Sequence, residues 1–328
     1  MRAVVLEQTG GPLRLVERPE PQPTGSQEAI DVTACGICHS DLHVVAGDYN
    51  SPLPLVLGHE VTGVHPELGP VMVYACWGCR QPDCWACSSG QEMICPRSHE
   101  AGLVDDGGYT DRMLVPDRSY LVPLGDLDPV QVAPLACGGL TAFRAVGHTL
   151  PTLREPRQGG GRRRALVLGA GGLGQFGLQF LRQQSDAEVV VVDTAAAKRD
   201  EAVRLGADAA VAPDDLEGTF DAVVDFVGAQ ATLEAMGQHV ARQGIAVVVG
   251  LFGGRLPFGM GAVPHEARFM TSIWGTRDQL AELLAHVAAH PLASPVEAVA
   301  LEDAQVAHDR LAAGDVAGRL VLVTGGAA

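Results

Sequence analysis

The sequence contains the stretch Ala165-Leu-Val-Leu-Gly169-Ala-Gly-Gly-Leu-Gly174, in which an apolar run leads directly into a glycine-rich turn. This turn has the pattern G-x-G-x-x-G, and a segment with helical character follows it to about Gln184. The next apolar run, 188–192, ends at Asp193. An uninterrupted apolar strand is typical of a parallel sheet that is covered on both faces. Strand, glycine turn, helix and acid-terminated strand in this order predict a dinucleotide-binding unit.

Each glycine of the turn has a predicted role in binding a dinucleotide. Gly169 allows the tight turn, Gly171 lets the backbone approach a pyrophosphate, and Gly174 lets the helix pack closely on the strand. Gly172 and Leu173 belong to the same turn, where free N–H groups at the start of the helix face the phosphates. A glycine-rich turn that binds some other phosphate is the alternative interpretation.

Asp193 indicates which dinucleotide is bound. A carboxylate at the end of the second strand accepts hydrogen bonds from the adenosine ribose hydroxyls, and its charge repels a 2′-phosphate. We therefore expect NAD to be favoured over NADP. Lys198 and Arg199 lie nearby, and their positive charges weaken the preference for NAD. We also expect Lys198 to contact the cofactor.

The pattern on either side of the glycine turn predicts two domains and an α/β chain. From the first residue to about 140, short apolar strands are broken by Pro and Gly, which is typical of a β-rich domain. Strands and helices then alternate, as in a doubly wound parallel sheet, and Pro151 is expected to end the helix that begins at Leu140. The tail, 318–323, reads as a strand that rejoins the first domain. We expect a first domain of 1–140 completed by 277–328, and a nucleotide-binding domain of 141–276.

Composition excludes several classes of protein. A length of 328 residues suits two domains, and a net charge of −16 argues against binding nucleic acid or anionic membranes. No apolar run approaches the ~20 residues that span a bilayer, and charge appears too early for a signal peptide. We expect a cytoplasmic protein with reduced thiols, in which eight cysteines indicate metal binding or catalysis before disulfides.

Two groups of residues have the composition of zinc sites. Cys38, His59 and Cys137 form a three-ligand set, which leaves a fourth position open for water or substrate. A second group is closely spaced and has four thiols, the composition of a closed structural site. Cys76 is a fifth candidate, because two residues separate it from Cys79, a spacing found between zinc ligands. The alternative interpretation is that the cysteines of this group are reduced core residues or disulfide partners. The second group consists of Cys79, Cys84, Cys87 and Cys95.

Together these residues resemble the zinc-containing alcohol dehydrogenases of the medium-chain dehydrogenase/reductase family. The matching pieces, in order, are 35–43, Gly58-His-Glu60, the cysteine group, Asp106-Gly-Gly-Tyr109, 135–139 and the turn at Gly169. The resemblance implies a GroES-like, β-rich catalytic domain and a Rossmann domain, with the active site in the cleft between them. It also implies two Zn²⁺ ions per chain, a small-molecule substrate and a homo-oligomer, either dimer or tetramer.

The resemblance also implies roles for the residues around the catalytic zinc. Asp41 corresponds to the carboxylate that orients the ligand histidine, and Glu60 to an acid that approaches the metal during ligand exchange. Ser40 resembles the hydroxyl that binds the reacting alcohol, and His43 the outer end of a proton relay. His39 occupies a position that touches the pyrophosphate. The simpler interpretations are a helix cap for Ser40 and Asp41, a surface histidine for His43 and a buried acid for Glu60.

The sequence departs from the family pattern at two places. The segment between Glu60 and Cys76 is short, which predicts a trimmed hairpin, and four residues instead of two separate Cys79 from Cys84. The leading hypothesis is an NAD-dependent zinc oxidoreductase acting on a primary or secondary alcohol, or on its aldehyde or ketone. One alternative uses the same metal and cofactor to reduce a C=N or conjugated C=C bond. The other is a metal- and nucleotide-binding redox sensor without turnover.

Overall fold

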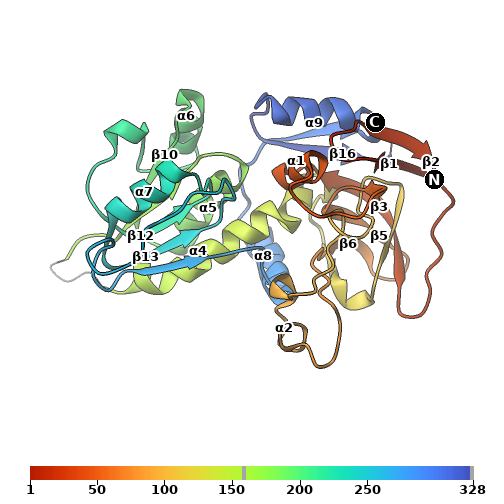
Figure 1. The fold of residues 1–328 in the computed structure, drawn as a ribbon, viewed down its shortest axis with the longest axis horizontal. Coiled ribbons are helices and arrows are strands. Elements are labelled where there is room, and N and C mark those ends of the chain that lie inside the picture. Colours follow the sequence, from red (N-terminus) through yellow and green to blue (C-terminus); the bar gives the residue numbers. More distant parts are fainter. Residues whose placement is uncertain (157–159, 326–328) are drawn as a thin grey trace. The chain divides into compact units, whose positions relative to one another are not determined.

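The computed structural model describes residues 1–156 and 160–325 and divides into two compact units (Figure 1). Unit 1 consists of Met1–Leu140, Gly275–Ala289 and Ser294–Ala328, and unit 2 of Thr141–Trp274 and His290–Ala293. The chain therefore leaves unit 1, forms unit 2, and returns. The helix α4 (Gly138–Arg154) begins in unit 1 and continues into unit 2. No helix among the described residues has the length and apolar character needed to cross a membrane.

Unit 1 is built on two β-sheets. A three-stranded sheet has the order β2-β1-β4, and a larger mixed sheet has the order β15-β16-β3-β5-β6-β8, with β7 also paired to β3. The strands are β1 (Arg2–Leu6), β2 (Leu13–Glu17), β3 (Glu28–Gly36), β4 (Leu55–Val56), β5 (Glu60–His65), β6 (Gly69–Val73), β7 (Arg112–Val115), β8 (Leu121–Pro123), β15 (Val296–Ala300) and β16 (Arg319–Val323).

Short helices fill the connections of unit 1. The α-helices are α1 (His39–Ala46), α2 (Trp85–Ser88), α3 (Pro129–Val132), α8 (Arg277–Ala289) and α9 (Ala304–Ala312). Shorter 3₁₀ turns are Glu92–Ile94, Arg118–Tyr120, Ala133–Ala136 and Leu301–Asp303. The α8 helix begins with the reciprocal pair expected of a capping box. Thr276 N donates to Gln279 Oε1 at 3.0 Å, and Gln279 N donates to Thr276 Oγ1 at 3.1 Å.

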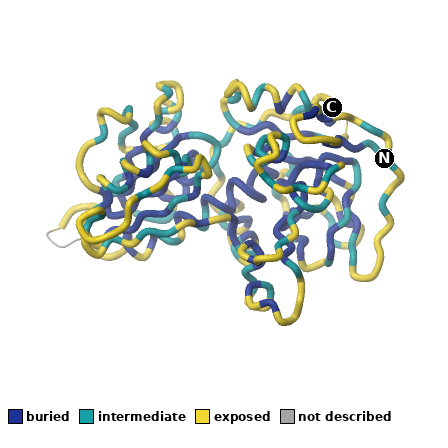
Figure 2. The backbone as a smooth tube through the Cα atoms, viewed as in Figure 1, coloured by how far each residue is buried: buried dark blue, intermediate teal, exposed yellow. Residues whose placement is uncertain are grey.

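Strand β16 lies inside the larger sheet, between β15 and β3. In β3, Gly36 pairs with Val321 of β16 on one side and with Glu60 of β5 on the other. These strands are almost wholly buried (Figure 2). The prediction that residues 318–323 form a strand that returns to the first domain is confirmed. The ends of these three strands also position the site described below.

Unit 2 is a six-stranded, wholly parallel sheet with the order β11-β10-β9-β12-β13-β14. From the central β9 the chain winds first to one edge and then to the other, which confirms the doubly wound α/β class. The strands are β9 (Arg164–Leu168), β10 (Glu188–Val192), β11 (Ala209–Val211), β12 (Phe220–Asp225), β13 (Val240–Val248) and β14 (Arg268–Thr271), and the helices are α5 (Gly172–Gln184), α6 (Ala196–Arg204) and α7 (Gln230–His239), with a 3₁₀ turn at Pro213–Asp215.

The expectation that Pro151 ends a helix is wrong. Pro151 lies inside α4, which continues to Arg154. A proline removes one backbone hydrogen bond and normally interrupts a helix interior. Here Leu150 and Leu153 are both buried, so their packing holds the last turn in place beyond the proline.

Candidate active site and metal centres

Three separate segments of unit 1 bring together four side chains that can bind a metal. Cys38 is the N-cap of α1, His59 and Glu60 stand at the start of β5, and Cys137 lies between a 3₁₀ turn and α4. Their ligand atoms all lie within 4.8 Å of one another, and all four side chains are buried. The structure thus places Cys38, His59 and Cys137 in one cluster, with Glu60 beside them.

Asp41 fixes the orientation of the histidine in this cluster. Its carboxylate is completely buried, with Oδ1 at 3.1 Å from His59 Nδ1, while Oδ2 accepts a hydrogen bond from Cys38 N at 2.8 Å. Burial, the largest single influence, lowers the pKa of His59, but the charges and hydrogen bonds of Asp41 and Cys38 together raise the pKa well above its usual value. With Nδ1 held by the carboxylate, Nε2 is the nitrogen that could serve as a metal ligand.

The two thiols of the cluster are linked by a hydrogen bond. Hydrogen bonds from Cys137 and His59 hold the pKa of Cys38 well below its usual value, whereas the same interaction raises the pKa of Cys137. Cys38 is therefore the readier thiolate, the form that binds metal. Two sulfur atoms and an imidazole nitrogen suit zinc and do not suit magnesium or calcium, which prefer oxygen ligands. The residues present therefore fit a zinc ion with three protein ligands.

Glu60 is held in a buried ion pair that the sequence analysis did not anticipate. Its Oε2 lies 2.5 Å from an Arg319 nitrogen, and its Oε1 accepts a hydrogen bond from Gly138 N at 3.1 Å. Burial raises the pKa of Glu60 to about 7, although Arg319 acts in the opposite direction. A Cβ atom at Gly36 would lie 2.1 Å from Glu60 Oε2, so only glycine fits there. The one sequence signal for Arg319 is a lone arginine at the start of an apolar strand.

The residues assigned to proton transfer lie along α1. Ser40 is in the first turn, with its Oγ 3.8 Å from Cys38 Sγ. His43 lies further along the helix, has 31% of its side chain exposed, and binds Asp48 Oδ2 through Nδ1 at 2.7 Å. His39, the first residue of the helix, is exposed. The side chains assigned to the relay thus lead from the buried cluster towards the surface.

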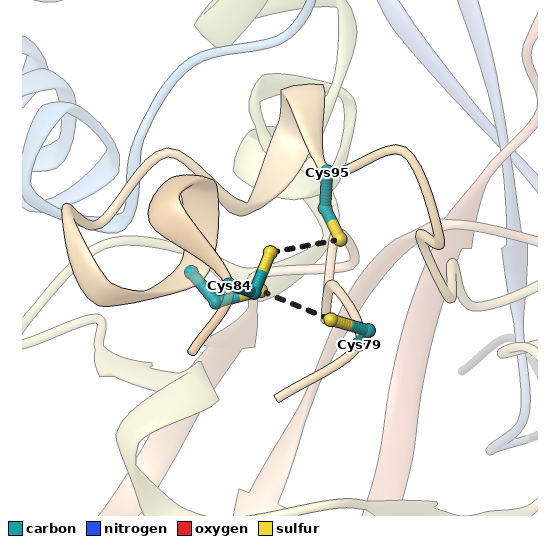
Figure 3. Close-up of side chains that lie close together, drawn as sticks. Cys79, Cys84 and Cys95 are labelled. Carbon is teal, nitrogen blue, oxygen red and sulfur yellow. Dashed lines mark hydrogen bonds between the residues drawn. The ribbon is translucent and has the colours of Figure 1, made fainter. Parts of the chain in front are cut away.

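A second cluster consists of four thiols in a loop of unit 1. The sulfur atoms of Cys79 and Cys87 are 3.9 Å apart, and those of Cys84 and Cys95 are 3.7 Å apart. Figure 3 shows Cys79, Cys84 and Cys95 with their sulfur atoms turned towards one another. All four ligand atoms lie within 4.8 Å, and Cys76 is not among them. A closed tetrahedral zinc site has this composition.

The glycine turn of unit 2 has the geometry that a dinucleotide-binding turn requires. Gly169 has a φ of +89°, and a Cβ atom at Gly174 would lie 1.8 Å from the carbonyl oxygen of Gly169. Gly171 is the N-cap of α5, and a Cβ atom there would meet nothing within 4 Å, so the backbone is open to a ligand. Gly172 and Leu173 are the first two residues of α5.

Asp193 lies directly against this turn. One carboxylate oxygen accepts a hydrogen bond from Ala170 N at 2.8 Å, and the other accepts one from Ala195 N at 2.9 Å. Arg199 donates to the carbonyl oxygen of Asp193 at 2.8 Å, and Lys198 is exposed on α6. The carboxylate is thus fixed next to the glycines that are expected to bind the phosphates.

Comparison with known proteins agrees with this arrangement. A model described as the alcohol dehydrogenase GroES-like domain matches residues 25–126, and one described as zinc-binding dehydrogenase matches residues 172–289. An NAD-dependent alcohol dehydrogenase of Sulfurisphaera tokodaii is 32% identical, and the match covers 98% of this chain and 100% of that protein. The chain belongs to the zinc-containing alcohol dehydrogenases. It is therefore an oxidoreductase of the medium-chain dehydrogenase/reductase family.

Other members of the zinc-containing alcohol dehydrogenases extend the comparison. An alcohol dehydrogenase of Geobacillus stearothermophilus is 32% identical over 98% of this chain and 99% of its own length. The crystal structure of an alcohol dehydrogenase from Aeropyrum pernix has a TM-score of 0.87 and 28% identity, covering 99% of this chain and 100% of that one. An acetophenone reductase of Geotrichum candidum, solved with NAD, has a TM-score of 0.85 and 26% identity, covering 98% and 97%.

Proposed function

We propose that this protein is a zinc-dependent alcohol dehydrogenase that transfers hydride between NAD(H) and a primary or secondary alcohol, or its aldehyde or ketone. The observation that carries this proposal is the convergence of Cys38, His59 and Cys137, with Ser40 beside them. Three protein ligands leave one coordination position for substrate, as a catalytic zinc requires. The Ser40 hydroxyl stands where it can bind a substrate oxygen.

The residues in and around the cluster have two proposed roles, metal binding and proton transfer. Cys38, His59 and Cys137 would hold the zinc, which when bound acts as a Lewis acid on the substrate oxygen. Asp41 keeps His59 in the tautomer that presents Nε2, and Glu60 lies close enough to approach the metal during ligand exchange. Ser40 takes up or delivers the proton at the substrate oxygen, and His43 passes it to solvent. General acid–base help of this kind contributes about 10²–10⁴ in rate.

For the cofactor we propose NAD in preference to NADP. The turn from Gly169 to Gly174 would bind the pyrophosphate, with His39 as a further contact, and Asp193 would accept the ribose hydroxyls. Because the Asp193 carboxylate is held by two backbone N–H groups, it cannot easily turn away from a 2′-phosphate. Lys198 would contact the ribose side of the cofactor. A D-arabinose 1-dehydrogenase (NADP⁺) of Saccharolobus solfataricus, 28% identical, shows that relatives use both cofactors.

We further propose a second, structural zinc bound by Cys79, Cys84, Cys87 and Cys95, which gives two zinc ions per chain. Residues 1–140 with 277–328 would form the catalytic domain, and residues 141–276 the NAD-binding domain. All eight cysteines are free thiols, which suits a reducing cytoplasm. A homo-oligomer, dimer or tetramer, is proposed on the basis of the edge strand β14 and the exposed apolar side chains of Phe258 and Met260 near it.

Replacing one ligand tests the catalytic site. Cys38→Ser is expected to bind one zinc ion per chain instead of two and to lose activity, because the zinc of the four-cysteine site is independent of Cys38. The matched control is Cys35→Ser, which removes a buried thiol that belongs to neither cluster and should keep two zinc ions. Elemental analysis and NADH oxidation are measured together. A Cys38→Ser protein that keeps two zinc ions and full turnover would refute the ligand assignment.

A substrate panel separates the proposed activity from its alternatives. NADH and NADPH are supplied separately with aldehydes, ketones, imines and enones. We expect NADH oxidation with aldehydes or ketones, and weaker use of NADPH. Oxidation only with imines or enones would favour the alternative reductase, and none with any compound would favour a redox sensor without turnover.

A further inference from the structure

A buried histidine outside the metal cluster is connected to it through a tyrosine. His308 lies in α9 with only 3% of its surface exposed, and its Nε2 is 3.0 Å from Tyr109 Oη. The two rings meet edge to face, with centroids 5.7 Å apart. Tyr109 is completely buried and donates its hydroxyl proton to Asp41 Oδ2 at 3.1 Å. Asp41 in turn binds the proposed ligand His59.

The number of available protons fixes the direction of these hydrogen bonds. An ionised carboxylate only accepts, so the single hydroxyl proton of Tyr109 goes to Asp41. The Tyr109 oxygen must then accept, and His308 must donate its Nε2 proton. Burial lowers the pKa of His308, although Asp41 and Asp309 act in the opposite direction. The proton on Nε2 is required by the hydrogen bond to Tyr109 whatever the charge of the ring. The two hydrogen bonds therefore run, from donor to acceptor, from His308 to Tyr109 and from Tyr109 to Asp41.

These two hydrogen bonds affect how Asp41 holds His59. A hydroxyl that accepts one hydrogen bond becomes a stronger donor in the next, so His308 strengthens the bond from Tyr109 to Asp41. The carboxylate divides its charge between Tyr109, Cys38 N and His59. Its position against His59 therefore depends on the Tyr109 hydroxyl. Such outer partners commonly change metal affinity by about 10–100-fold.

The backbone leaves Tyr109 little freedom to adjust. Tyr109 N donates to the carbonyl oxygen of Leu57 at 3.0 Å, and Gly108 N donates to that of Gly58 at 2.8 Å. A Cβ atom at Gly58 would lie 2.3 Å from the Tyr109 ring. The ring is therefore packed directly against the segment that leads into His59, and its hydroxyl has a fixed position.

We propose that His308 is a positioning residue for the metal site, acting through Tyr109 and Asp41 on the ligand His59. The inference rests on the proposed zinc site at Cys38, His59 and Cys137. It assigns a role to a residue that belongs to neither of the two clusters of candidate metal ligands among the described residues. It also explains a buried, hydrogen-bonded pair that the reaction itself does not use.

The test compares two substitutions of His308. His308→Phe keeps the ring volume but removes the donor, and His308→Gln keeps an N–H donor. The zinc-loaded enzyme is mixed with a chelator, and the release of each zinc ion is followed; the visible spectrum of the cobalt-substituted enzyme is recorded separately. We expect His308→Phe to release the zinc of the Cys38 site about 10–100-fold faster and to change the cobalt spectrum. His308→Gln is expected to restore both, and Tyr109→Phe to behave like His308→Phe.

A second buried tyrosine provides the control for a general loss of stability. Tyr74 Oη donates to the carbonyl oxygen of Gly275 at 2.7 Å in the same unit. Tyr74→Phe should therefore lower the melting temperature without faster zinc release. The proposal is overturned if His308→Phe releases zinc at the wild-type rate. It is also overturned if Tyr74→Phe and His308→Phe accelerate release equally. If the proposed zinc site itself is wrong, the wild-type enzyme will lack zinc at Cys38, and this outcome differs from both results that overturn the role of His308.

Discussion

Gly58 illustrates how closely single residues are fitted around the candidate zinc site. Its φ is +95°, a conformation that side-chain-bearing residues rarely adopt. A Cβ atom there would also lie 2.3 Å from the Tyr109 ring and 2.6 Å from Cys35 Sγ. The residue before the ligand His59 therefore carries both a backbone and a packing constraint.

We predict that Gly58→Ala lowers the free energy of unfolding by about 2–5 kcal/mol, because backbone strain and overpacking add. The control is Gly69→Ala, where φ is +71° but a Cβ atom would meet nothing within 4 Å. That substitution should lower the free energy by only about 1–2 kcal/mol. Urea denaturation of both variants gives the comparison. Equal effects would show that packing against Tyr109 contributes nothing.

At the scale of elements, the four-cysteine loop has almost no core of its own. Its only helices are α2 and the 3₁₀ turn Glu92–Ile94, and its buried cluster is Cys84, Ala86 and Cys95 packed against the other two cysteines. Elements this short are not stable in isolation. The loop therefore depends on a cross-link between its thiols, which a bound metal would provide.

We predict that removing the proposed zinc of this loop makes residues 79–95 sensitive to protease while the two sheets of unit 1 stay protected. Cys95→Ser should have the same effect without a chelator. Limited proteolysis followed by mass spectrometry locates the cleavage sites. Cleavage within residues 79–95 at the same rate with and without zinc would contradict a structural role for the metal.

For the whole molecule, the edge strand β14 of unit 2 is the place where a second copy is expected to bind. The nearby side chains of Phe258 and Met260 are 76% and 93% exposed. Met260→Glu is predicted to shift the oligomer towards monomer without loss of stability, because a side chain this exposed contributes little to folding. Val306→Glu, at an exposed apolar position on α9 of unit 1, is the control. Sedimentation velocity measures both, and an unchanged Met260→Glu oligomer would place the interface elsewhere.

Local patterns in the sequence predict much of this molecule. The turn from Gly169 to Gly174 and the candidate ligands Cys38 and His59 are recognisable because each lies in a short segment with fixed spacing. The partners Arg319 and His308 are not recognisable in this way. They meet Glu60 and Tyr109 only after β16 and α9 have packed onto unit 1, so no spacing in the sequence records the contact. Pro151 departs from the prediction for a related reason, because burial of its neighbours Leu150 and Leu153 outweighs the tendency of proline to end a helix.

The distance along the chain between Glu60 and Arg319 has a consequence for biosynthesis. The two residues form one ion pair, yet they lie 259 positions apart, so the carboxylate is translated long before its arginine. Until Arg319 has been translated, the nascent chain carries Glu60 and the thiol of Cys38 without β16 beside them. Metal insertion before that point would meet an incomplete site, so we expect loading to follow the packing of β16 onto β3.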